Sequence, residues 1–218
     1  MCLVKINFKI IVCLSIFVFS FSCNSVNSSK QLKIYLPSDI NPKLVDSSLL
    51  GKKVHQISDF KLLSQMGDTV TLRDLEGKIY VADFFFTTCA NICPKMTAQM
   101  KDLHDFYIDD NDIFFVSHTV YPEIDSVEVL RAYAEDYKVN PNKWVMLTGD
   151  KKEIYELARK SYFAVLTDGD GGERDFVHTE NFVLIDKFQR IRGYYDGTLK
   201  NEMKRLRSDI EILRTEYR

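Results

Sequence analysis

Hydrophobic residues along this chain form continuous runs that are followed by segments with helical spacing. Three runs rich in β-branched and aromatic residues predict buried strands, and they lie at 78–88, 112–120 and 144–149. Segments with apolar residues three and four positions apart predict helices, and they lie at 95–107, 126–137 and 151–161. In the second helix we expect Val129, Leu130 and Tyr133 to face inward. This order predicts an α/β sandwich whose first strands are parallel.

Shorter elements flank this core. Residues 60–72 contain two strand-like runs around a Gly-Asp turn and predict a hairpin. Residues 180–197 predict two strands joined by a turn, so the sheet is expected to be mixed, with an antiparallel pair at its end. A last helix is predicted over 198–217. Its hydrophobic spacing permits a coiled-coil seam, but the wider stripe that includes Ile212 favours packing on the sheet.

The first 22 residues have a different pattern from the rest. Two lysines precede an almost wholly apolar run at 10–21, and a serine and Cys23 follow it. This layout resembles a bacterial lipoprotein signal peptide over 1–22, after which Cys23 is lipidated and becomes the new N-terminus. The run is too short to span a bilayer comfortably. An ordinary secretory signal or an anchor helix is the alternative, since Ser20 stands where a leucine is usual.

Residues 23–52 are polar and irregular, with two prolines and few periodic hydrophobic positions. They are predicted to be a flexible tether, roughly 30 Å from end to end, between the lipid and one domain over 53–218. We therefore expect an extracytoplasmic, membrane-anchored lipoprotein that faces the periplasm. The chain has 29 basic and 31 acidic residues without a basic stripe, which argues against nucleic-acid binding.

Cys89 and Cys93 follow the 78–88 run directly, with three residues between them and Pro94 behind them. Proline is tolerated in the first turn of a helix and disfavours helical geometry before it, so the helix is expected to begin at Cys93 or Pro94. Both sulfurs then lie at a helix N-terminus, where N–H groups and the helix dipole favour the thiolate. The thiolate is the form that binds metal ions and attacks disulfides.

Four kinds of chemistry compete for this pair. A structural disulfide that closes so short a loop would constrain the unfolded chain little. A zinc site needs about four ligands, and the sequence has no second C-x-x-C or H-x-x-x-H pair. A thioredoxin-type redox pair usually has two intervening residues rather than three. Copper held by two thiolates and one further ligand fits as well, because soft sulfur ligands select Cu(I) and imidazole suits both oxidation states.

The third ligand would come from one of four histidines. His55 precedes the first hairpin, and His104 lies within a helix, where we expect it to face solvent. His118 ends the second long strand, and His178 directly precedes the strand that starts at 180. Both are expected at the sheet edge that carries the cysteines, where the carboxyl ends of parallel strands meet. The residues alone leave His118 and His178 as near equals.

Four segments in order carry a family resemblance: "DFFFTTCANICPKMTAQM", "SHTVYPEIDSVEVLRAYA", "WVMLTGDKKEIYEL" and "VHTENFVLIDKFQRIRGYYDGT". Together they resemble the SCO/SenC family of cytochrome oxidase assembly proteins, over roughly residues 55–198. The resemblance implies a thioredoxin-like fold with a central mixed sheet, anchored to a membrane and facing outside the cytoplasm. It also implies copper, as Cu(I) or Cu(II), bound by Cys89, Cys93 and His178.

The resemblance further implies a task, which is to deliver copper to, or to maintain, the binuclear copper centre of cytochrome c oxidase subunit II. Another copper-site protein is the alternative partner. The alternative function is a thiol–disulfide oxidoreductase in which Cys89 and Cys93 are catalytic and reduce partner cysteines. A thiol peroxidase is less favoured, because no clear arrangement of Thr, Pro and Arg surrounds one cysteine.

Three positions depart from the family's usual pattern. Tyr121 stands where an aspartate is usual, and Ala90 replaces a frequent proline. His118 stands where an apolar residue is more usual. We interpret His118 as a strand-end residue rather than as an auxiliary ligand.

Overall fold

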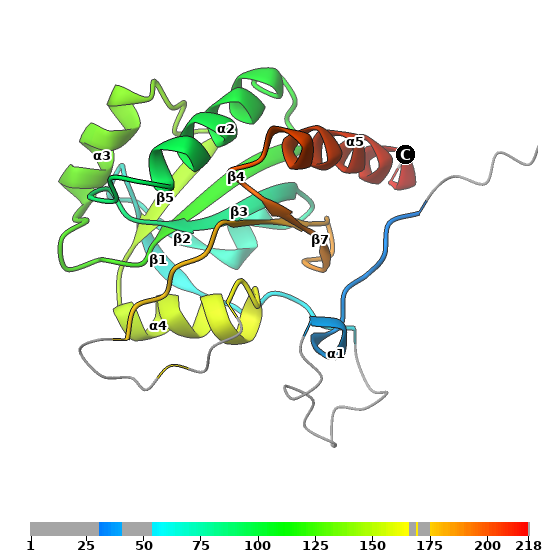
Figure 1. Ribbon diagram of the computed structural model, residues 1–218, viewed down its shortest axis with the longest axis horizontal. Helices are drawn as coiled ribbons and strands as arrows, with labels where there is room; N and C mark the ends of the chain where they lie inside the picture. Colours follow the sequence, from blue (N-terminus) through cyan, green and yellow to red (C-terminus); the bar gives the residue numbers. More distant parts are fainter. Residues whose placement is uncertain (1–30, 41–53, 166–168, 170–174, 218) are drawn as a thin grey trace, which may run out of the picture.

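A mixed seven-stranded sheet forms the centre of the protein, as the computed structural model shows (Figure 1). The structure describes residues 31–40, 54–165, 169 and 175–217. The strands are β1 (Lys61–Ser64), β2 (Thr69–Thr71), β3 (Ile79–Phe85), β4 (Ile113–Thr119), β5 (Trp144–Thr148), β6 (Asn181–Ile185) and β7 (Ile191–Asp196). They are ordered β2-β1-β5-β4-β3-β6-β7, with β3, β4 and β5 parallel. The β1–β2 hairpin and the β6–β7 pair are antiparallel, which confirms the predicted mixed sheet.

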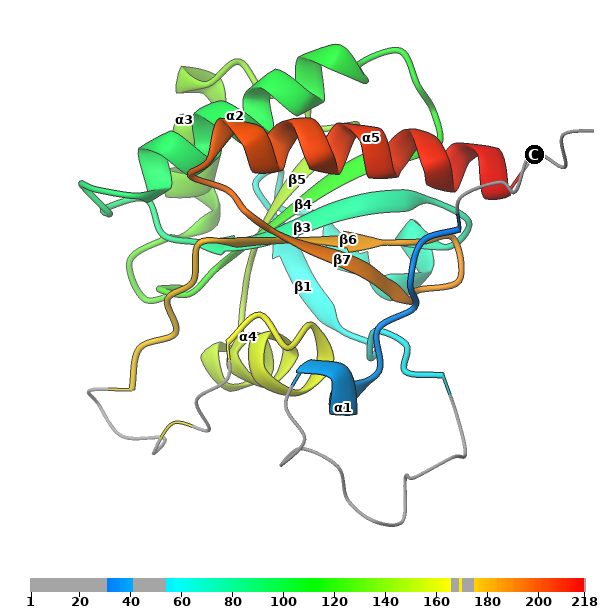
Figure 2. The same ribbon diagram turned by 45° about the vertical axis from the view of Figure 1, so that its right-hand side comes forward.

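Helices cover both faces of this sheet (Figure 2). On one face lie α2 (Cys93–Phe106), α3 (Val127–Asp136) and α5 (Lys200–Glu216). On the other face lie the short helix α1 (Pro37–Ile40) and helix α4 (Lys151–Glu156), which continues as the π-helical turn η4 (Leu157–Ser161). A 3₁₀ turn, η3 (Leu72–Leu75), follows β2. The single helix predicted over 151–161 is therefore split into an α-helical and a π-helical part.

Burial on both faces explains the continuous hydrophobic run of β3. All seven of its residues are buried. Tyr80, Ala82 and Phe84 belong to the hydrophobic cluster that includes α4. Val81 and Phe85 belong to the cluster under α2 and α5. Because successive side chains point to opposite faces, one strand serves two cores and needs hydrophobic residues at nearly every position.

Helix α5 packs on the sheet rather than forming a coiled-coil seam. Its inward stripe consists of Met203, Leu206, Ile210 and Leu213, which are all buried. In α3 the stripe is narrower than predicted. Leu130 is buried as expected, but Val129 is 37% exposed, so its predicted inward orientation is wrong. Val129 is one position, and hence about 100°, from Leu130 on the helix surface, which turns it toward solvent.

Part of the predicted tether is docked on the domain. The main-chain N–H of Tyr35 donates to the Ile191 carbonyl at 2.9 Å. The Arg192 guanidinium donates to the carbonyls of Leu32 at 2.8 Å and Lys33 at 3.2 Å. Residues 31–40 therefore do not form a free tether. The predicted signal peptide, Cys23 and the rest of the tether lie outside the described residues, among which no helix is both long and apolar enough to cross a bilayer.

A buried ionic network holds this docked segment. The Asp186 carboxylate accepts hydrogen bonds from Arg190, Arg192 and the Tyr217 hydroxyl. Burial opposes the ionisation of Asp186, but these hydrogen bonds outweigh it and lower the pKa of the carboxyl group. Arg192 also pairs with Glu216 at 2.6 Å. Buried charges require such partners, so the network ties the β6–β7 turn, the end of α5 and the N-terminal segment together.

The docked segment and the cysteines lie at opposite ends of the sheet. Strands β3 and β6 are antiparallel, with Tyr80 opposite Ile185. The β6–β7 turn is therefore beside the start of β3, whereas the cysteines follow its end. Figures 1 and 2 show the same arrangement, with the N-terminal segment and α5's C-terminus on one side and the start of α2 on the other.

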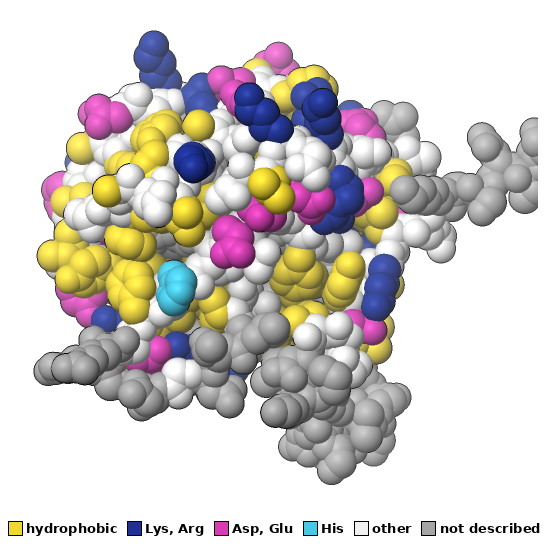
Figure 3. Space-filling model, viewed as in Figure 1, with side chains coloured by type: hydrophobic (Ala, Val, Ile, Leu, Met, Phe, Trp, Pro, Cys, Tyr) yellow, Lys and Arg dark blue, Asp and Glu magenta, His cyan; other side chains and the backbone are white. Residues whose placement is uncertain are grey.

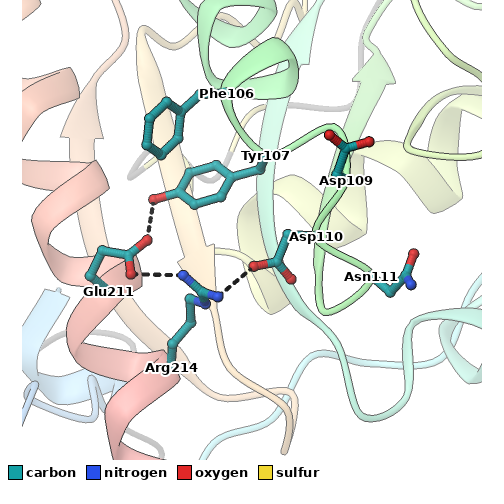
Figure 4. A pocket seen from close by; sticks show the side chains of 7 residues that line it. All are labelled: Phe106, Tyr107, Asp109, Asp110, Asn111, Glu211 and Arg214. Atoms are coloured by element: carbon teal, nitrogen blue, oxygen red, sulfur yellow. Dashed lines mark hydrogen bonds and ion pairs between the residues drawn. The ribbon is translucent and has the colours of Figure 1, made fainter.

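A polar pocket also lies away from the cysteines, between the C-terminal ends of α2 and α5 (Figure 4). Arg214 pairs with Asp110 at 2.9 Å and with Glu211 at 2.8 Å. The Tyr107 hydroxyl donates to Glu211 at 3.0 Å. These lining residues satisfy one another and join α5 to the loop that precedes β4, so we assign the pocket a structural role.

Replacing Arg192 with methionine is expected to destabilise the protein by ~3 kcal/mol, because buried Asp186 and Glu216 would lose a shared partner. The matched control is Lys160→Met, which removes an exposed ion pair with Glu156 and is expected to cost less than ~1 kcal/mol. Urea unfolding monitored by circular dichroism measures both. Equal effects of the two substitutions would contradict the structural role of the network.

Candidate functional site

The two cysteines lie at the junction of β3 and α2. Helix α2 begins at Cys93 with Pro94 directly behind it, as the sequence predicted. Both thiols are free; Cys93 is buried and Cys89 is half-buried. The main-chain N–H of Cys93 points at the Cys89 sulfur, at 3.5 Å. The helix start thus holds the sulfur of the loop cysteine next to the helix cysteine.

The two thiols differ in acidity. Burial raises the pKa of Cys89, but hydrogen bonds from the Cys93 thiol and from the main chain at Asn91, Cys93 and Ile92 outweigh it, so the net pKa is lowered. The pKa of Cys93 is raised to about 12, first by burial, then by its hydrogen bond to Cys89 and by the negative charges of Cys89 and Asp83. Cys89 is therefore the readily ionised thiol, and Cys93 keeps its proton.

Asp83 is a buried acid beside this pair that sequence reasoning missed. It lies in the middle of β3, and one carboxylate oxygen has no hydrogen-bond partner among the described residues. Burial raises the pKa of Asp83 to about 7, against a hydrogen bond from Ser117 that lowers it. An acidic residue inside a continuous hydrophobic run was the signal that could have identified it.

Asp125 is a second missed residue, and it holds the cysteine loop in place. Its buried carboxylate accepts hydrogen bonds from the main-chain N–H of Thr87, at 3.1 Å, and from the Thr87 hydroxyl. It also accepts one from the hydroxyl of Thr119 at the end of β4. Thr87 is two residues before Cys89, so Asp125 ties the cysteine loop to the neighbouring strand. Nothing in the local pattern marks Asp125 as buried.

Two of the four histidines, His104 and His55, are bound to structural partners rather than placed as metal ligands. His104 is buried, against the prediction that it faces solvent. Its Nε2 accepts the Asn140 main-chain N–H at 3.2 Å, and Nδ1 pairs with Asp105. His104 follows Leu103 of α2's buried stripe, and its ring contacts Asn140 in the loop before β5. His55 binds the Ser161 carbonyl at 2.7 Å.

His118 lies on the opposite face of the sheet from Cys93. Its ring is fully buried in the cluster under α4, stacked on Phe84 with ring centroids 4.9 Å apart. Neither ring nitrogen has a hydrogen-bond partner among the described residues. Burial lowers the pKa of His118 to about 4, so the ring is neutral. This position favours the strand-end interpretation over an auxiliary metal ligand.

Replacing His118 with leucine is expected to make the protein more resistant to acid. The folded pKa is about 4, below the ordinary value of about 6.5, so between these values the unfolded chain binds a proton that the folded chain does not. Stability is therefore lost as pH falls through this window. The difference in unfolding free energy between His118→Leu and the native protein should therefore shift in favour of the variant by about 2–3 kcal/mol when the pH falls from about 7.5 to about 4.5. Urea unfolding at both pH values measures this difference, and an equal effect at both would contradict it.

His178 lies on the segment that enters β6, and its ring is exposed. Its Nδ1 is 3.2 Å from the Phe176 carbonyl oxygen. Within the described parts of the chain, no three His, Cys, Asp or Glu side chains form a cluster that could hold a metal ion. The three predicted ligands are therefore not gathered into a preassembled site. Figure 3, viewed as Figure 1, shows an exposed histidine side chain in cyan beside hydrophobic side chains in yellow.

Iodoacetamide is expected to alkylate Cys89 at least about tenfold faster than Cys93, because the thiolate is the reactive form and Cys93 is buried and holds its proton. Peptide mass spectrometry after timed quenching measures the two rates. Cys89→Ser should leave only the slow reaction, and Cys93→Ser should keep a reactive Cys89. Equal rates in the native protein would contradict the assigned acidities.

The fold and the dithiol together define a thioredoxin-like protein with a C-x-x-x-C pair at the start of a helix. The family model described as SCO1/SenC matches residues 50–212. The chain therefore belongs to the SCO1/SenC family, as the sequence motifs indicated.

Bacterial relatives agree with this assignment. The SCO1 protein homolog of Bacillus subtilis is 32% identical over 163 residues, which cover 74% of this chain and 84% of the relative. The solved structure of a SCO1/SenC family lipoprotein from Bacillus anthracis has a TM-score of 0.64 at 28% identity, covering 73% of this chain and 95% of that chain. BsSco, a member of the Sco family of cytochrome c oxidase assembly proteins, has a TM-score of 0.62 at 32% identity, covering 73% and 93%. The predicted thioredoxin-like fold is confirmed.

Proposed function

We propose that this protein is an extracytoplasmic copper chaperone that delivers copper to, or maintains, the binuclear copper centre of cytochrome c oxidase subunit II. The observation that carries the proposal is the pair of thiols of unequal acidity at the start of α2, in a chain of the SCO1/SenC family. In this assignment Cys89, Cys93 and His178 bind the ion. Copper is the cargo, not a permanent part of the protein.

The donor chemistry supports copper. Thiolates select Cu(I), and imidazole binds both oxidation states. The lowered pKa of Cys89 makes one thiolate available, and binding would displace the proton of Cys93. Arabidopsis thaliana ScoI and yeast Sco1 have structures with copper bound, and at 24% and 22% identity they share the fold with this chain. A relative from Stutzerimonas stutzeri, 24% identical over 156 residues, is described as a putative copper-binding protein.

The site also suits a protein that passes its ion on. Three protein ligands leave a position at which a ligand of the recipient can coordinate the ion before the ligands of this protein dissociate from it. Cys89 is half-buried rather than enclosed, and His178 is exposed, so both can be reached by a partner. BsSco, which is 32% identical, belongs to a family of cytochrome c oxidase assembly proteins, and this supports an oxidase as the recipient.

The proposed location rests on the N-terminal sequence. The signal-like residues 1–22 and Cys23 match the layout of a lipoprotein, and the relative from Bacillus anthracis is described as a lipoprotein. A lipid on Cys23 would hold the domain at the outer side of a membrane. Among the described residues, 31–36 would then be nearest to the lipid in the sequence, and they are docked on the domain.

The second candidate function is thiol–disulfide exchange, in which Cys89 and Cys93 reduce cysteines of a partner. The unequal acidities favour it, because an ionised, accessible Cys89 can attack a partner disulfide, forming a mixed disulfide and releasing one partner thiolate. Cys93 then gives its proton to that thiolate and attacks the Cys89 sulfur, which forms the Cys89–Cys93 disulfide and releases the second partner sulfur. BsSco has been described as containing a disulfide switch. Both functions use the same two sulfurs, and only copper delivery requires His178.

Replacing His178 with alanine separates the two functions. If the protein is a copper chaperone, His178→Ala should weaken Cu(I) binding by on the order of 100-fold and change the visible spectrum of the Cu(II) form. The rate of thiol–disulfide exchange should stay close to the native rate, because both sulfurs remain. Competition with a chromophoric chelator and a disulfide-exchange assay measure these quantities.

His55→Ala is the matched control, since His55 is bound to a main-chain carbonyl in another part of the domain; it should leave copper affinity unchanged. Cys89→Ser and Cys93→Ser should each abolish both activities. The chaperone proposal fails if the reduced native protein takes up no copper. The ligand assignment alone fails if copper binds tightly but His178→Ala has the affinity of the native protein.

A further inference from the structure

The side chains from Asp175 to Glu180, which surround His178, alternate between the core and the surface. Val177 and Thr179 are buried, whereas Phe176, His178 and Glu180 are exposed. Alternation with a period of two is the behaviour of an extended chain, in which residues two apart lie on the same side. Phe176 and His178 therefore lie on one side of this segment.

Phe176 connects this side to the cysteine loop. Its ring meets the ring of Phe86 edge-to-face, with centroids 5.0 Å apart and planes at 88°. Phe86 is in the loop that carries Cys89, and its carbonyl accepts the main-chain N–H of Cys89 at 3.3 Å. Phe176 thus contacts Phe86, whose main chain is hydrogen-bonded to Cys89.

Tyr121 completes an aromatic cluster with these two rings. Its ring lies edge-to-face with Phe176, with centroids 5.9 Å apart and planes at 88°. Tyr121 comes from the loop after β4, which Asp125 ties to the cysteine loop. The rings of Phe86 and Tyr121 therefore belong to loops that are already fixed to each other, and Phe176 packs against both rings.

Other contacts of the segment lead elsewhere. Asp175 pairs with Arg159 of η4, with nitrogen and oxygen 2.8 Å apart. The Thr179 hydroxyl donates to the Ala164 carbonyl at 2.9 Å. These anchors fix the segment to the α4 side of the domain. The ring contact between Phe176 and Phe86 joins the segment directly to the cysteine loop.

We propose that Phe176 is a positioning residue for copper: its ring, clamped between Phe86 and Tyr121, holds the segment that carries His178 against the loop that carries Cys89. This inference rests on the proposed function, because it takes His178 as the third ligand. With the clamp in place, the backbone at Phe176, two residues before His178, is already held against the cysteine loop before the ion binds. Pre-ordering of this kind raises affinity by reducing the entropy lost on binding.

The Tyr121 ring extends the surface that Phe176 contacts beyond Phe86. The phenylalanine two residues before His178 and the tyrosine after β4 are therefore expected to act as a pair.

The test is a double-mutant cycle on full-length protein in detergent, with Cu(I) affinity measured by chelator competition. Phe176→Ala is expected to weaken Cu(I) binding about five- to tenfold, because two edge-to-face contacts are lost. In the His178→Ala background the same substitution should have no further effect, since the positioned ligand is already absent. This non-additivity is the signature of action through His178. Phe176→Tyr, which keeps the ring, should restore the native affinity.

Phe188→Ala is the matched control, because Phe188 is a 55% exposed phenylalanine at the β6–β7 turn; it should leave copper binding unchanged. Phe176 is itself 36% exposed, so Phe176→Ala is expected to fold, and Phe176→Leu keeps the hydrophobic bulk without the ring if it does not. Native affinity in both variants would overturn the clamp. An equal loss with and without His178 would also overturn it. A native affinity in His178→Ala would instead remove the ligand assignment itself.

Discussion

The site depends on how β3 ends. This strand is buried on both faces, and hydrophobic side chains on alternate sides anchor it to two cores. Its last residue is therefore fixed, and the chain has only a short loop before α2 begins at Cys93. The first N–H groups of that helix have no partner within the helix, and one of them points at the Cys89 sulfur. Rigid strand, short loop and helix start together determine the position and acidity of the thiols.

The surroundings divide the work between the two cysteines. The Cys93 thiol and main-chain donors lower the pKa of Cys89 and favour its thiolate, while burial keeps Cys93 protonated. Asp83 adds negative charge near Cys93 from within the strand. Asp125 fixes the loop from outside the strand through Thr87. A pair arranged in this way can bind a soft ion or exchange a disulfide, and these two functions are distinguished by whether the histidine takes part.

The N-terminal segment and the cysteines lie at opposite ends of the sheet. At one end, the buried network of Asp186, Arg192 and Glu216 holds the N-terminal segment against the domain. At the other end are the cysteine loop and the segment that bears His178. A protein attached to a membrane through its N-terminus would thus be fixed at the end away from its thiols.

The sequence alone determined the order of the strands and helices, the mixed sheet, the start of α2 at Cys93 and the family, because burial on two faces and the proline after Cys93 leave local patterns. It did not reveal that His104 is buried, that His118 lies across the sheet from Cys93, or that Asp83 and Asp125 surround the cysteines. Those facts follow from packing between segments far apart in the chain. The contacts of Phe176 with Phe86 and of His104 with Asn140 join residues far apart in the sequence, so they exist only after the chain has folded.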